Sequence, residues 1–360
     1  MSVARRLVAI ATSLPGRIAI SVGLLALVGI SIDWGDVVDK LAEASWGWFV
    51  LGTALVLVAF VVAAIRWHIL LHTAGLRPPL RETLRAYAIG AFTNNLLPTG
   101  FGGDAVRAWL VAPRGAPLAR ALTSVGIDRI SAFACLLPIA WLGVVLGGDA
   151  IPDGFVALLA IASVGMVAGF GTAIAVLRRR GLGRFLPRLM RPWASEVAST
   201  LRRYGGDRER LGEVIVLGFA FQVLIVAATW LLSEALELSL DPEVIAVVLP
   251  LVLVATLMPI SIAGFGVREG AFVALLAEVG VSSADALLLS LLTVASVAIA
   301  SLPGGVALAL RPGRLETPDE IFEDVGAPDP GADDPDGSAA GAPDPQQPDA
   351  EAASLPGRRR

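Results

Sequence analysis

Cysteine and charge are both scarce in this chain of 360 residues. The only cysteine is Cys135, so an intramolecular disulfide is excluded, and with it a small secreted fold held by such bonds. Charged residues make up 17% of the chain, whereas about 25% is usual in soluble domains. Apolar residues take their place, at 55% of the chain with a mean hydropathy of +0.73. These proportions exclude an ordinary soluble domain or a disordered protein and predict an all-α polytopic membrane protein.

Several motifs of catalysis and cofactor binding are also missing from the sequence. We find no Gly-rich nucleotide loop, no catalytic triad and no Cys/His metal spacing. His68 and His72 share a helix face, but no third ligand lies near them in the sequence, so packing is favoured over a zinc site. We therefore expect no catalytic residues, metal, cofactor or nucleic-acid partner, and no ATP-driven transport by this chain alone.

A membrane-spanning helix needs about 20 apolar residues. Arg5, Arg6 and Arg17 precede the first apolar stretch, which lacks a small-residue cleavage site and is therefore expected to stay as an uncleaved span. Six full spans are predicted, around residues 18–32, 46–71, 132–146, 155–177, 214–232 and 286–310.

The charges of the loops predict the orientation, because Lys and Arg are retained on the cytoplasmic side. Segments 33–43, 149–153 and 234–243 are acidic and are expected outside, whereas 66–85 and 178–210 are basic and are expected inside. Retention of topology is the favoured explanation of the basic segment 178–210, with attraction to anionic lipid as the alternative. The pattern predicts a multi-pass plasma-membrane protein with cytoplasmic N- and C-termini.

Two further apolar stretches, 86–111 and 244–276, are interrupted by proline and glycine. The first has basic residues at both ends and the second has acidic residues at both ends, so each is expected to enter and leave the membrane on the same side. We predict two re-entrant hairpins inserted from opposite sides. Irregular backbone at membrane depth survives only where protein or water shields it.

The interruptions in the two stretches resemble each other. Leu97-Pro98 precedes Gly100-Phe101-Gly102 in the first, and Met258-Pro259 precedes Gly264-Phe265-Gly266 in the second; Arg107 and Arg268 follow. Three spans and one hairpin in each half, with opposite starting sides, predict an inverted-topology repeat with halves of about 1–150 and 151–311 in one domain, 1–311. The alternative is that the tripeptide recurs by chance among 38 glycines. Residues 312–360, rich in proline and acidic residues, are expected to form a disordered cytosolic tail.

Polar residues cluster at the first interruption. Asp104 is expected to cap a second half-helix, and Arg107, one turn on, faces the same way. A helix N-terminus with a nearby arginine is an anion site. The candidate substrate-binding residues in this stretch are Asn94, Asn95, Thr99, Gly100, Gly102, Gly103, Asp104 and Arg107.

The second interruption supplies similar parts in Gly264, Gly266, Arg268 and Glu269. Pseudo-symmetry would bring both sets toward one central point, where a phosphate or phosphodiester would fit. Arg129 is a further candidate, since adjacent helical residues do not share a face and only one of Asp128 and Arg129 is expected to face a cavity. The alternative is that Asp104 and Arg107 merely pair with each other, or with Asp128 and Arg129, to neutralise buried charge.

These motifs resemble those of bacterial and archaeal flippase-like membrane proteins, similar to the transmembrane domain of lysylphosphatidylglycerol synthase/flippase. The matching residues run from Asn95 to Pro98, from Gly102 to Asp104 with Arg107, then Asp128-Arg129, and from Gly264 to Gly270. The resemblance covers about residues 17–311 and implies a lipid-translocating or lipid-handling domain. The cytosolic aminoacyl-transferring domain of the full synthase is absent from this chain, so lysyl transfer is not expected. The family often has Glu-Arg where this chain has Asp128-Arg129.

The favoured hypothesis is a flippase-like transporter, not driven by ATP, for an anionic phospholipid or a polyprenyl-phosphate-linked lipid. Asp104 and Glu269 would position the arginines or exchange protons. One alternative is a membrane enzyme or accessory subunit in lipid-linked glycan or aminoacyl-lipid synthesis, with Asp104, Asp128 or Glu269 as base. Another is a scaffold whose basic segment and tail recruit a cytosolic synthase as partner.

Overall fold

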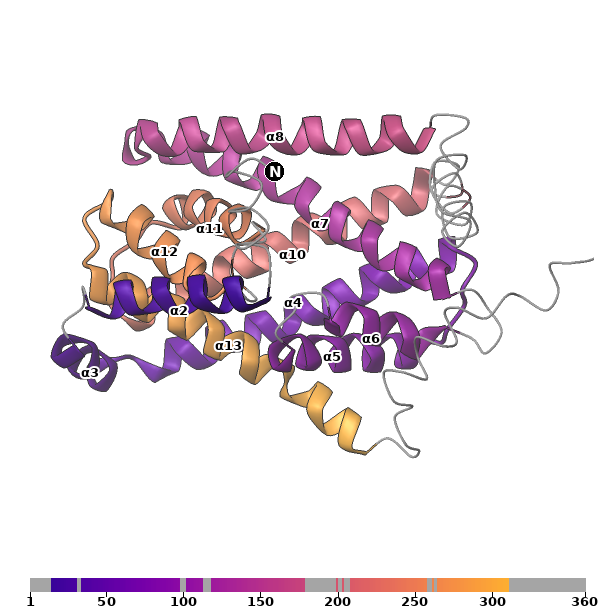
Figure 1. Ribbon diagram of the computed structural model, residues 1–360, viewed down its shortest axis with the longest axis horizontal. Coiled ribbons are helices and arrows are strands. Elements are labelled where there is room, and N and C mark those ends of the chain that lie inside the picture. Colours follow the sequence, from indigo (N-terminus) through magenta and orange to yellow (C-terminus); the bar gives the residue numbers. More distant parts are fainter. Residues whose placement is uncertain are drawn as a thin grey trace, which may run out of the picture.

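The computed structural model describes residues 14–30, 34–97, 102–112, 118–178, 199, 203, 208–257, 261 and 264–310 (Figure 1). The candidate residues Thr99 and Gly100, most of the basic segment 178–210 and the tail 312–360 lie outside these ranges. The described elements are all helical, which confirms the all-α prediction. They are α2 (Leu14–Ile30), α3 (Trp34–Glu43), α4 (Trp46–Thr73), α5 (Leu80–Leu96), α6 (Gly102–Val111), α7 (Leu118–Gly147), the 3-10 turn η1 (Gly148–Ala150), α8 (Asp153–Arg178), α10 (Arg208–Ala235), α11 (Pro242–Thr256), α12 (Val267–Ala277) and α13 (Ser283–Ala309).

Four helical segments in the described part of the chain are long and apolar enough to cross a membrane. They are α4, α7 with η1, α10 and α13, and each overlaps a predicted span. The other two predicted spans overlap α2, which has 17 residues, and α8, whose apolar part covers Asp153–Gly169. The chain therefore has the helices of a multi-pass membrane protein.

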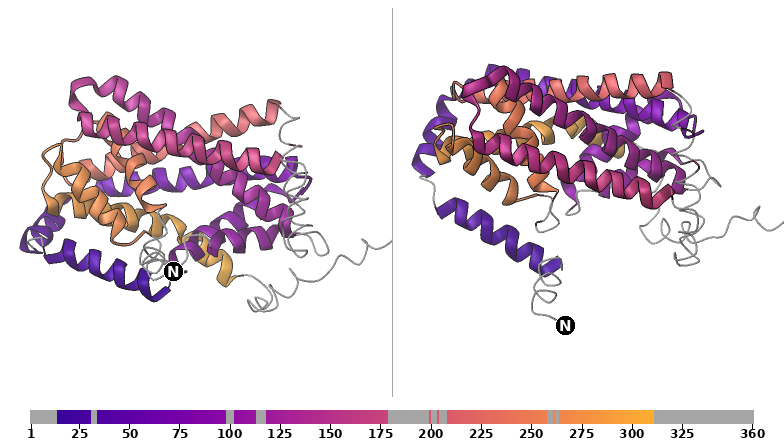
Figure 2. Two further views of the ribbon diagram at one scale, coloured as in Figure 1. Left: turned by 45° about the horizontal axis from the view of Figure 1, so that its top comes forward. Right: turned by 90° about the horizontal axis from the view of Figure 1, so that it is seen from above.

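The helices form an elongated bundle, with α8 along one side next to α7 (Figure 1). Helix α2 lies at the edge of the bundle (Figure 2), where it contacts α12. The largest buried apolar cluster joins α7, α8, α10, α11, α12 and α13, and includes Phe155, Val247, Phe272 and Leu289. A second cluster, around Trp67, joins α4, α5, α6 and α7.

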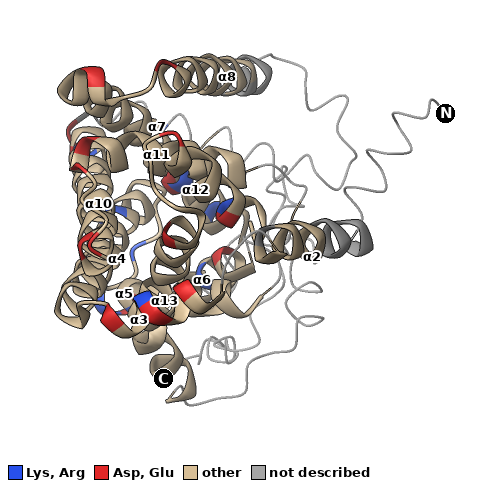
Figure 3. Ribbon diagram, turned by 90° about the vertical axis from the view of Figure 1, so that its left-hand side faces the viewer, with Lys and Arg blue, Asp and Glu red and all other residues tan. Residues whose placement is uncertain are grey.

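Acidic residues gather at one end of the bundle. Figure 3 looks onto the end where α3 lies and shows several of them there. The predicted outer segment 33–43 is largely helical, as α3, with Asp36 in the first turn and Lys40 in the last, where they complement the helix dipole. Lys40 forms an ion pair with Asp285 of α13, so α3 is tied to the start of the last helix.

The first interrupted stretch forms a tight pair of helices, α5 and α6. Helix α5 ends before Leu97, whose backbone is extended (φ −89°, ψ 137°) because a proline follows it. At the start of α6, Gly103 N donates to Asn94 Oδ1 over 2.8 Å, so α5 caps its neighbour. A Cβ on Gly103 would lie 2.0 Å from Gly90 O. The two glycines thus let the helix backbones touch.

Helix α13 packs against α5 just as closely. A Cβ on Gly304 would lie 1.9 Å from Ala88 O. Asn95 Nδ2 donates to Ser301 Oγ over 2.9 Å, and Arg85 Nη2 donates to Ala307 O over 2.9 Å. These contacts fasten the α5–α6 pair to the last helix.

The second interrupted stretch also forms two short helices, α11 and α12. Gly264 and Gly266 both have φ of +82°, a conformation that favours glycine, and they turn the chain into α12. Gly266 N donates to Glu269 Oε2 over 2.6 Å. In Figure 1 the α5–α6 and α11–α12 pairs occupy opposite ends of the bundle, and the inner ends of α5 and α11 lie near the middle of its length.

The extent of α7 differs from the prediction. Its span was placed at 132–146, but the helix begins at Leu118. The hydropathy pattern stops at Asp128-Arg129, whereas in the structure partners from other helices compensate these charges. The pair therefore lies well inside α7, about 15 Å from its start at 1.5 Å per residue.

Candidate anion site

Five charged side chains meet where α4, α6 and α7 come together. We call them the charge cluster: Arg66 of α4, Asp104 and Arg107 of α6, and Asp128 and Arg129 of α7. Three of the five, Asp104, Arg107 and Arg129, were predicted as site residues. Asp104 lies in the first turn of α6 and Arg107 follows one turn later, so the start of this short helix brings both side chains to the cluster.

Asp128 forms the buried half of the cluster. Its Oδ1 accepts from Arg66 Nε over 2.8 Å, and its Oδ2 accepts from Arg107 Nη2 over 3.1 Å. The side chains of Arg66, Arg107 and Asp128 are between 2% and 4% exposed. A single carboxylate thus holds two guanidinium groups from different helices away from solvent.

Asp104 forms the more open half. Its Oδ1 accepts from Arg107 Nε over 3.0 Å, and its Oδ2 lies 2.8 Å from Arg129 Nη2 and 2.9 Å from Arg129 Nε. The Arg129 side chain is 43% exposed, whereas that of Asp104 is 9% exposed. Asp104 therefore connects a buried arginine to an accessible one.

The cluster holds more positive than negative charge. Three guanidinium groups, of Arg66, Arg107 and Arg129, face two carboxylates, of Asp104 and Asp128. Nη1 of Arg66 and Nη1 of Arg107 are buried and have no hydrogen-bond partner among the residues that the structure describes. Burying an unpaired donor costs about 1–3 kcal/mol, and more when the group is charged. One additional anion bound at the cluster would therefore balance its excess positive charge.

Aromatic rings support the buried guanidinium groups. Arg107 Cζ lies 4.7 Å from the ring centroid of Trp67 and 4.9 Å from that of Tyr87. Arg66 Cζ lies 5.5 Å from the ring centroid of Phe221. Cation–π contacts of this kind stabilise a desolvated cation and fix the plane of each guanidinium group.

The ion pairs among Asp104, Arg107, Asp128 and Arg129 are those of the alternative interpretation, in which these residues neutralise buried charge. Only one of Asp128 and Arg129 was expected to face a cavity, but both reach the charge cluster, Asp128 through Arg107 and Arg129 through Asp104. The other first-stretch candidates lie nearby in the chain: Asn94 caps Gly103, Asn95 contacts α13, and Gly102 begins α6.

The second set of predicted residues forms a separate group. Arg268 Nη2 donates to Glu269 Oε1 over 2.6 Å, and Arg268 Cζ lies 5.3 Å from the ring centroid of Phe265. Glu269 is buried and also accepts from Gly266 N. Within the described ranges, no ion pair or hydrogen bond joins this group to the charge cluster.

Arg66 is a member of the charge cluster that the sequence does not single out as a site residue. It was counted among the basic residues of the cytoplasmic segment 66–85, but the structure buries it within α4. A lone charge inside the apolar run from Trp46 to Leu71 was the available signal, since such charges usually have a buried partner.

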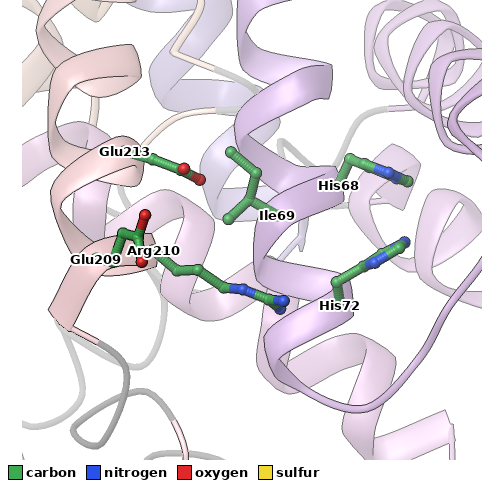
Figure 4. Close-up of a pocket in the computed structure, with 6 residues that line it drawn as sticks. All are labelled: His68, Ile69, His72, Glu209, Arg210 and Glu213. Carbon is green, nitrogen blue, oxygen red and sulfur yellow. The ribbon is translucent and has the colours of Figure 1, made fainter.

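Apart from the charge cluster, a hollow with a volume of about 520 Å³ lies between α4 and α10 (Figure 4). His68 and His72 line one side, and Glu209, Arg210 and Glu213 line the other. The imidazoles point away from the carboxylates in Figure 4. They lie instead against α5 and the residues before it, with His68 Nδ1 3.1 Å from Thr83 Oγ1 and His72 Nε2 3.3 Å from Pro78 O. No group of three or more metal-ligating side chains was found in the part of the chain that the structure describes.

Comparison with known proteins gives a family match over most of the chain. The family described as "Lysylphosphatidylglycerol synthase TM region" matches residues 16–305. Two relatives from Methanothermobacter thermautotrophicus, each named "UPF0104 membrane protein", are 24% and 22% identical to this chain. These matches cover 74% and 72% of this chain and 86% and 82% of the relatives.

A third relative is longer. "Glycosyltransferase AglD" from Haloferax volcanii is 26% identical over 342 aligned residues, and the match covers 82% of this chain and 54% of that protein. This chain is therefore similar to about half of AglD. No solved structure matches the chain.

Proposed function

Because the chain belongs to the lysylphosphatidylglycerol synthase transmembrane region family, we propose that it transports a lipid with an anionic headgroup between the leaflets of the membrane. The substrate would be an anionic phospholipid or a polyprenyl-phosphate-linked lipid, and ATP would not drive the movement. The proposal concerns the transmembrane region alone, since this is the part of the synthase that the chain matches.

The excess positive charge of the charge cluster is the observation that carries the proposal. Intramembrane charges are costly and usually balance one another. Here two arginines are buried, each with an Nη1 donor that has no partner within the described part of the chain, and a third is accessible. Phosphate suits this cluster because its several oxygens can form bidentate contacts with guanidinium groups.

We further propose that the chain has six full spans and two re-entrant hairpins arranged as an inverted-topology repeat. The short pairs α5–α6 and α11–α12, at opposite ends of the bundle in Figure 1, support this arrangement. Transporters with inverted repeats bind substrate where such broken helices meet. Arg268 and Glu269 in the second half would then form a second binding point for the substrate, separate from the charge cluster that contains Arg107.

The proposed location is the plasma membrane, with both termini in the cytoplasm. The basic residues around α5, and the acidic segments at 149–153 and 234–243, support this orientation. An anionic lipid would enter the charge cluster from the lipid or the aqueous phase beside Arg129, its accessible member.

Lipid movement in reconstituted vesicles tests the proposal. Purified full-length protein would be placed in vesicles that contain a fluorescent phosphatidylglycerol, and dithionite would quench the label in the outer leaflet over time. Arg107→Ala is expected to abolish protein-dependent movement, because Arg107 joins both carboxylates of the cluster. Arg81→Ala, at an exposed position at the start of α5, is the matched control and should move lipid at the wild-type rate.

Equal rates for Arg107→Ala and the wild-type protein would reject a transport role for the charge cluster. Size-exclusion chromatography in detergent checks that the variant is folded. A fluorescent phosphatidylcholine serves as the second substrate, and wild-type protein should move it more slowly because its headgroup has no net charge. A polyprenyl-phosphate analogue separates the two proposed lipid classes.

A second candidate function is supported by the match to glycosyltransferase AglD. The chain would then be a membrane enzyme, or an accessory subunit that works with a cytosolic synthase, in lipid-linked glycan or aminoacyl-lipid synthesis. Asp104, Asp128 or Glu269 would act as base in the enzyme. Product formed by the purified protein from a nucleotide sugar and a polyprenyl-phosphate acceptor, without lipid movement in vesicles, would favour this function over transport.

A further inference from the structure

We propose that Asp104 is a built-in substitute for the substrate phosphate. Its carboxylate occupies the accessible arginine of the charge cluster when no anion is bound, and the phosphate displaces it. This inference rests on the proposed function, because it assumes that the charge cluster binds an anionic headgroup. It assigns the two carboxylates of the cluster different tasks: Asp128 holds the arginines in place, and Asp104 competes with the substrate.

The two carboxylates differ in which arginines they hold. Both partners of Asp128, Arg66 and Arg107, are at most 4% exposed. Asp104 shares Arg107 but has Arg129, which is 43% exposed, as its other partner. An incoming anion can therefore contact Arg129 directly from the exposed side of its ion pair with Asp104, whereas the two arginines that hold Asp128 are enclosed.

The contacts of Asp104 resemble those that a phosphate would make. One carboxylate oxygen accepts from Arg107 Nε, and the other lies within 3 Å of two nitrogens of Arg129. A phosphate presents more acceptor oxygens than a carboxylate and forms strong bidentate bonds with arginine.

Competition from Asp104 would also suit a transporter. A substrate must bind well enough to enter a pathway but weakly enough to leave it. Asp104 is the first-turn acid of α6 and is anchored by the backbone of that helix. It therefore stays beside the bound phosphate, repels it and can retake Arg129 when the phosphate departs. The accessible arginine would then have an anionic partner in both states.

Calorimetric titration of the purified full-length protein in a non-ionic detergent tests this inference. Inorganic phosphate and short-chain phosphatidylglycerol are titrated separately at one ionic strength, so that a free anion and a lipid headgroup are distinguished. Asp104→Asn and Asp104→Ser both remove the competing charge. The dissociation constant for phosphatidylglycerol is expected to fall about tenfold in each variant. Agreement between the two variants would show that the effect comes from the lost charge and not from the side chain that replaces Asp104.

Arg129→Gln and Asp104→Glu are the matched controls. The first removes the contested arginine and should weaken binding about tenfold, and the second keeps the competing charge and should leave the dissociation constant within about threefold of wild type. Unchanged or weaker binding by both folded neutral variants of Asp104 would overturn the inference. Tighter binding of inorganic phosphate alone would overturn it for lipid and assign the site to a free anion.

The outcome is separable from that of the transport assay. Tighter binding by the neutral variants, in a protein that moves no lipid in vesicles, would support the exchange at Asp104 and reject transport. Lipid movement by a protein whose neutral variants bind no more tightly would support transport and reject the exchange.

Discussion

Replacing Asp128 with asparagine is expected to destabilise the protein more than any other single change in the charge cluster. Asp128 accepts hydrogen bonds from Arg66 and Arg107, and all three side chains are almost fully buried. Breaking a buried ion pair by removing one partner costs about 3–5 kcal/mol, because the remaining charge is left uncompensated. Asp128→Asn deprives Arg66 of its only charged partner among the described residues, so we expect a loss in this range.

Asp104→Asn provides the comparison within the same cluster. Arg107 keeps Asp128 and its contacts with Trp67 and Tyr87, while Arg129 is exposed and can be solvated. The expected loss therefore lies below the range of about 3–5 kcal/mol expected for Asp128→Asn, because Arg107 keeps a charged partner and Arg129 can be solvated. The two substitutions are chemically identical, so the difference in burial of the partners accounts for the difference in stability.

Equilibrium unfolding in mixed micelles with increasing SDS, followed by tryptophan fluorescence, measures both free energies. Asp39→Asn, on the exposed face of α3, serves as the control for loss of one carboxylate and should change the free energy of unfolding little. Equal losses for Asp128→Asn and Asp104→Asn would refute the reasoning, because the partners would then contribute equally whatever their burial. Arg66→Gln, alone and combined with Asp128→Asn, would measure the coupling between the two residues directly.

Three further predictions concern helix packing and topology. Gly103→Ala should lower the free energy of unfolding by about 1–3 kcal/mol, because the added methyl group overpacks α5 against α6. Gly270→Ala, whose Cβ would meet nothing within 4 Å, should leave the free energy of unfolding nearly unchanged. The same SDS titration measures both variants. Lys40→Gln removes the tie between α3 and α13, and because Lys40 is partly exposed we expect a loss of at most about 1 kcal/mol together with faster hydrogen exchange in α3. Single cysteines at positions 85 and 114 on a Cys135→Ala background should be labelled from the same side of the membrane and a cysteine at 278 from the other, whereas labelling of 85 and 114 from different sides would contradict a re-entrant first hairpin.

Much of the fold can be predicted from the sequence, because a chain in lipid must satisfy its backbone hydrogen bonds internally and therefore forms helices. Apolar length predicts each long helix, and the proline after Leu97 predicts the end of α5, since it forces the preceding residue to be extended. The start of α7 could not be predicted in the same way. Its first half contains Asp128 and Arg129, whose charges fit inside a membrane protein only because α4 and α6 supply partners. Such partners are long-range contacts that hydropathy does not register.

The candidate site was predictable in part for a similar reason. The spacing of Asp104 and Arg107 is local to one helix, so the sequence alone indicates that they share a face. Arg66 and Asp128 are 62 residues apart in the chain, and only the packing of α4 against α7 brings them into contact. The same holds for the rings of Trp67 and Tyr87 beneath Arg107.

Arg107 connects the architecture of the first hairpin to its chemistry. Helix α6 is held by backbone contact with α5 through Gly103, and by its charged first turn to α4 and α7. The group that would bind the substrate is therefore also a group that positions the helix. Loss of activity in Arg107→Ala would consequently combine lost binding with a displaced hairpin. Arg129→Gln separates the two, because Arg129 is the exposed member of the cluster: it should lower lipid movement while the free energy of unfolding changes by no more than about 1 kcal/mol.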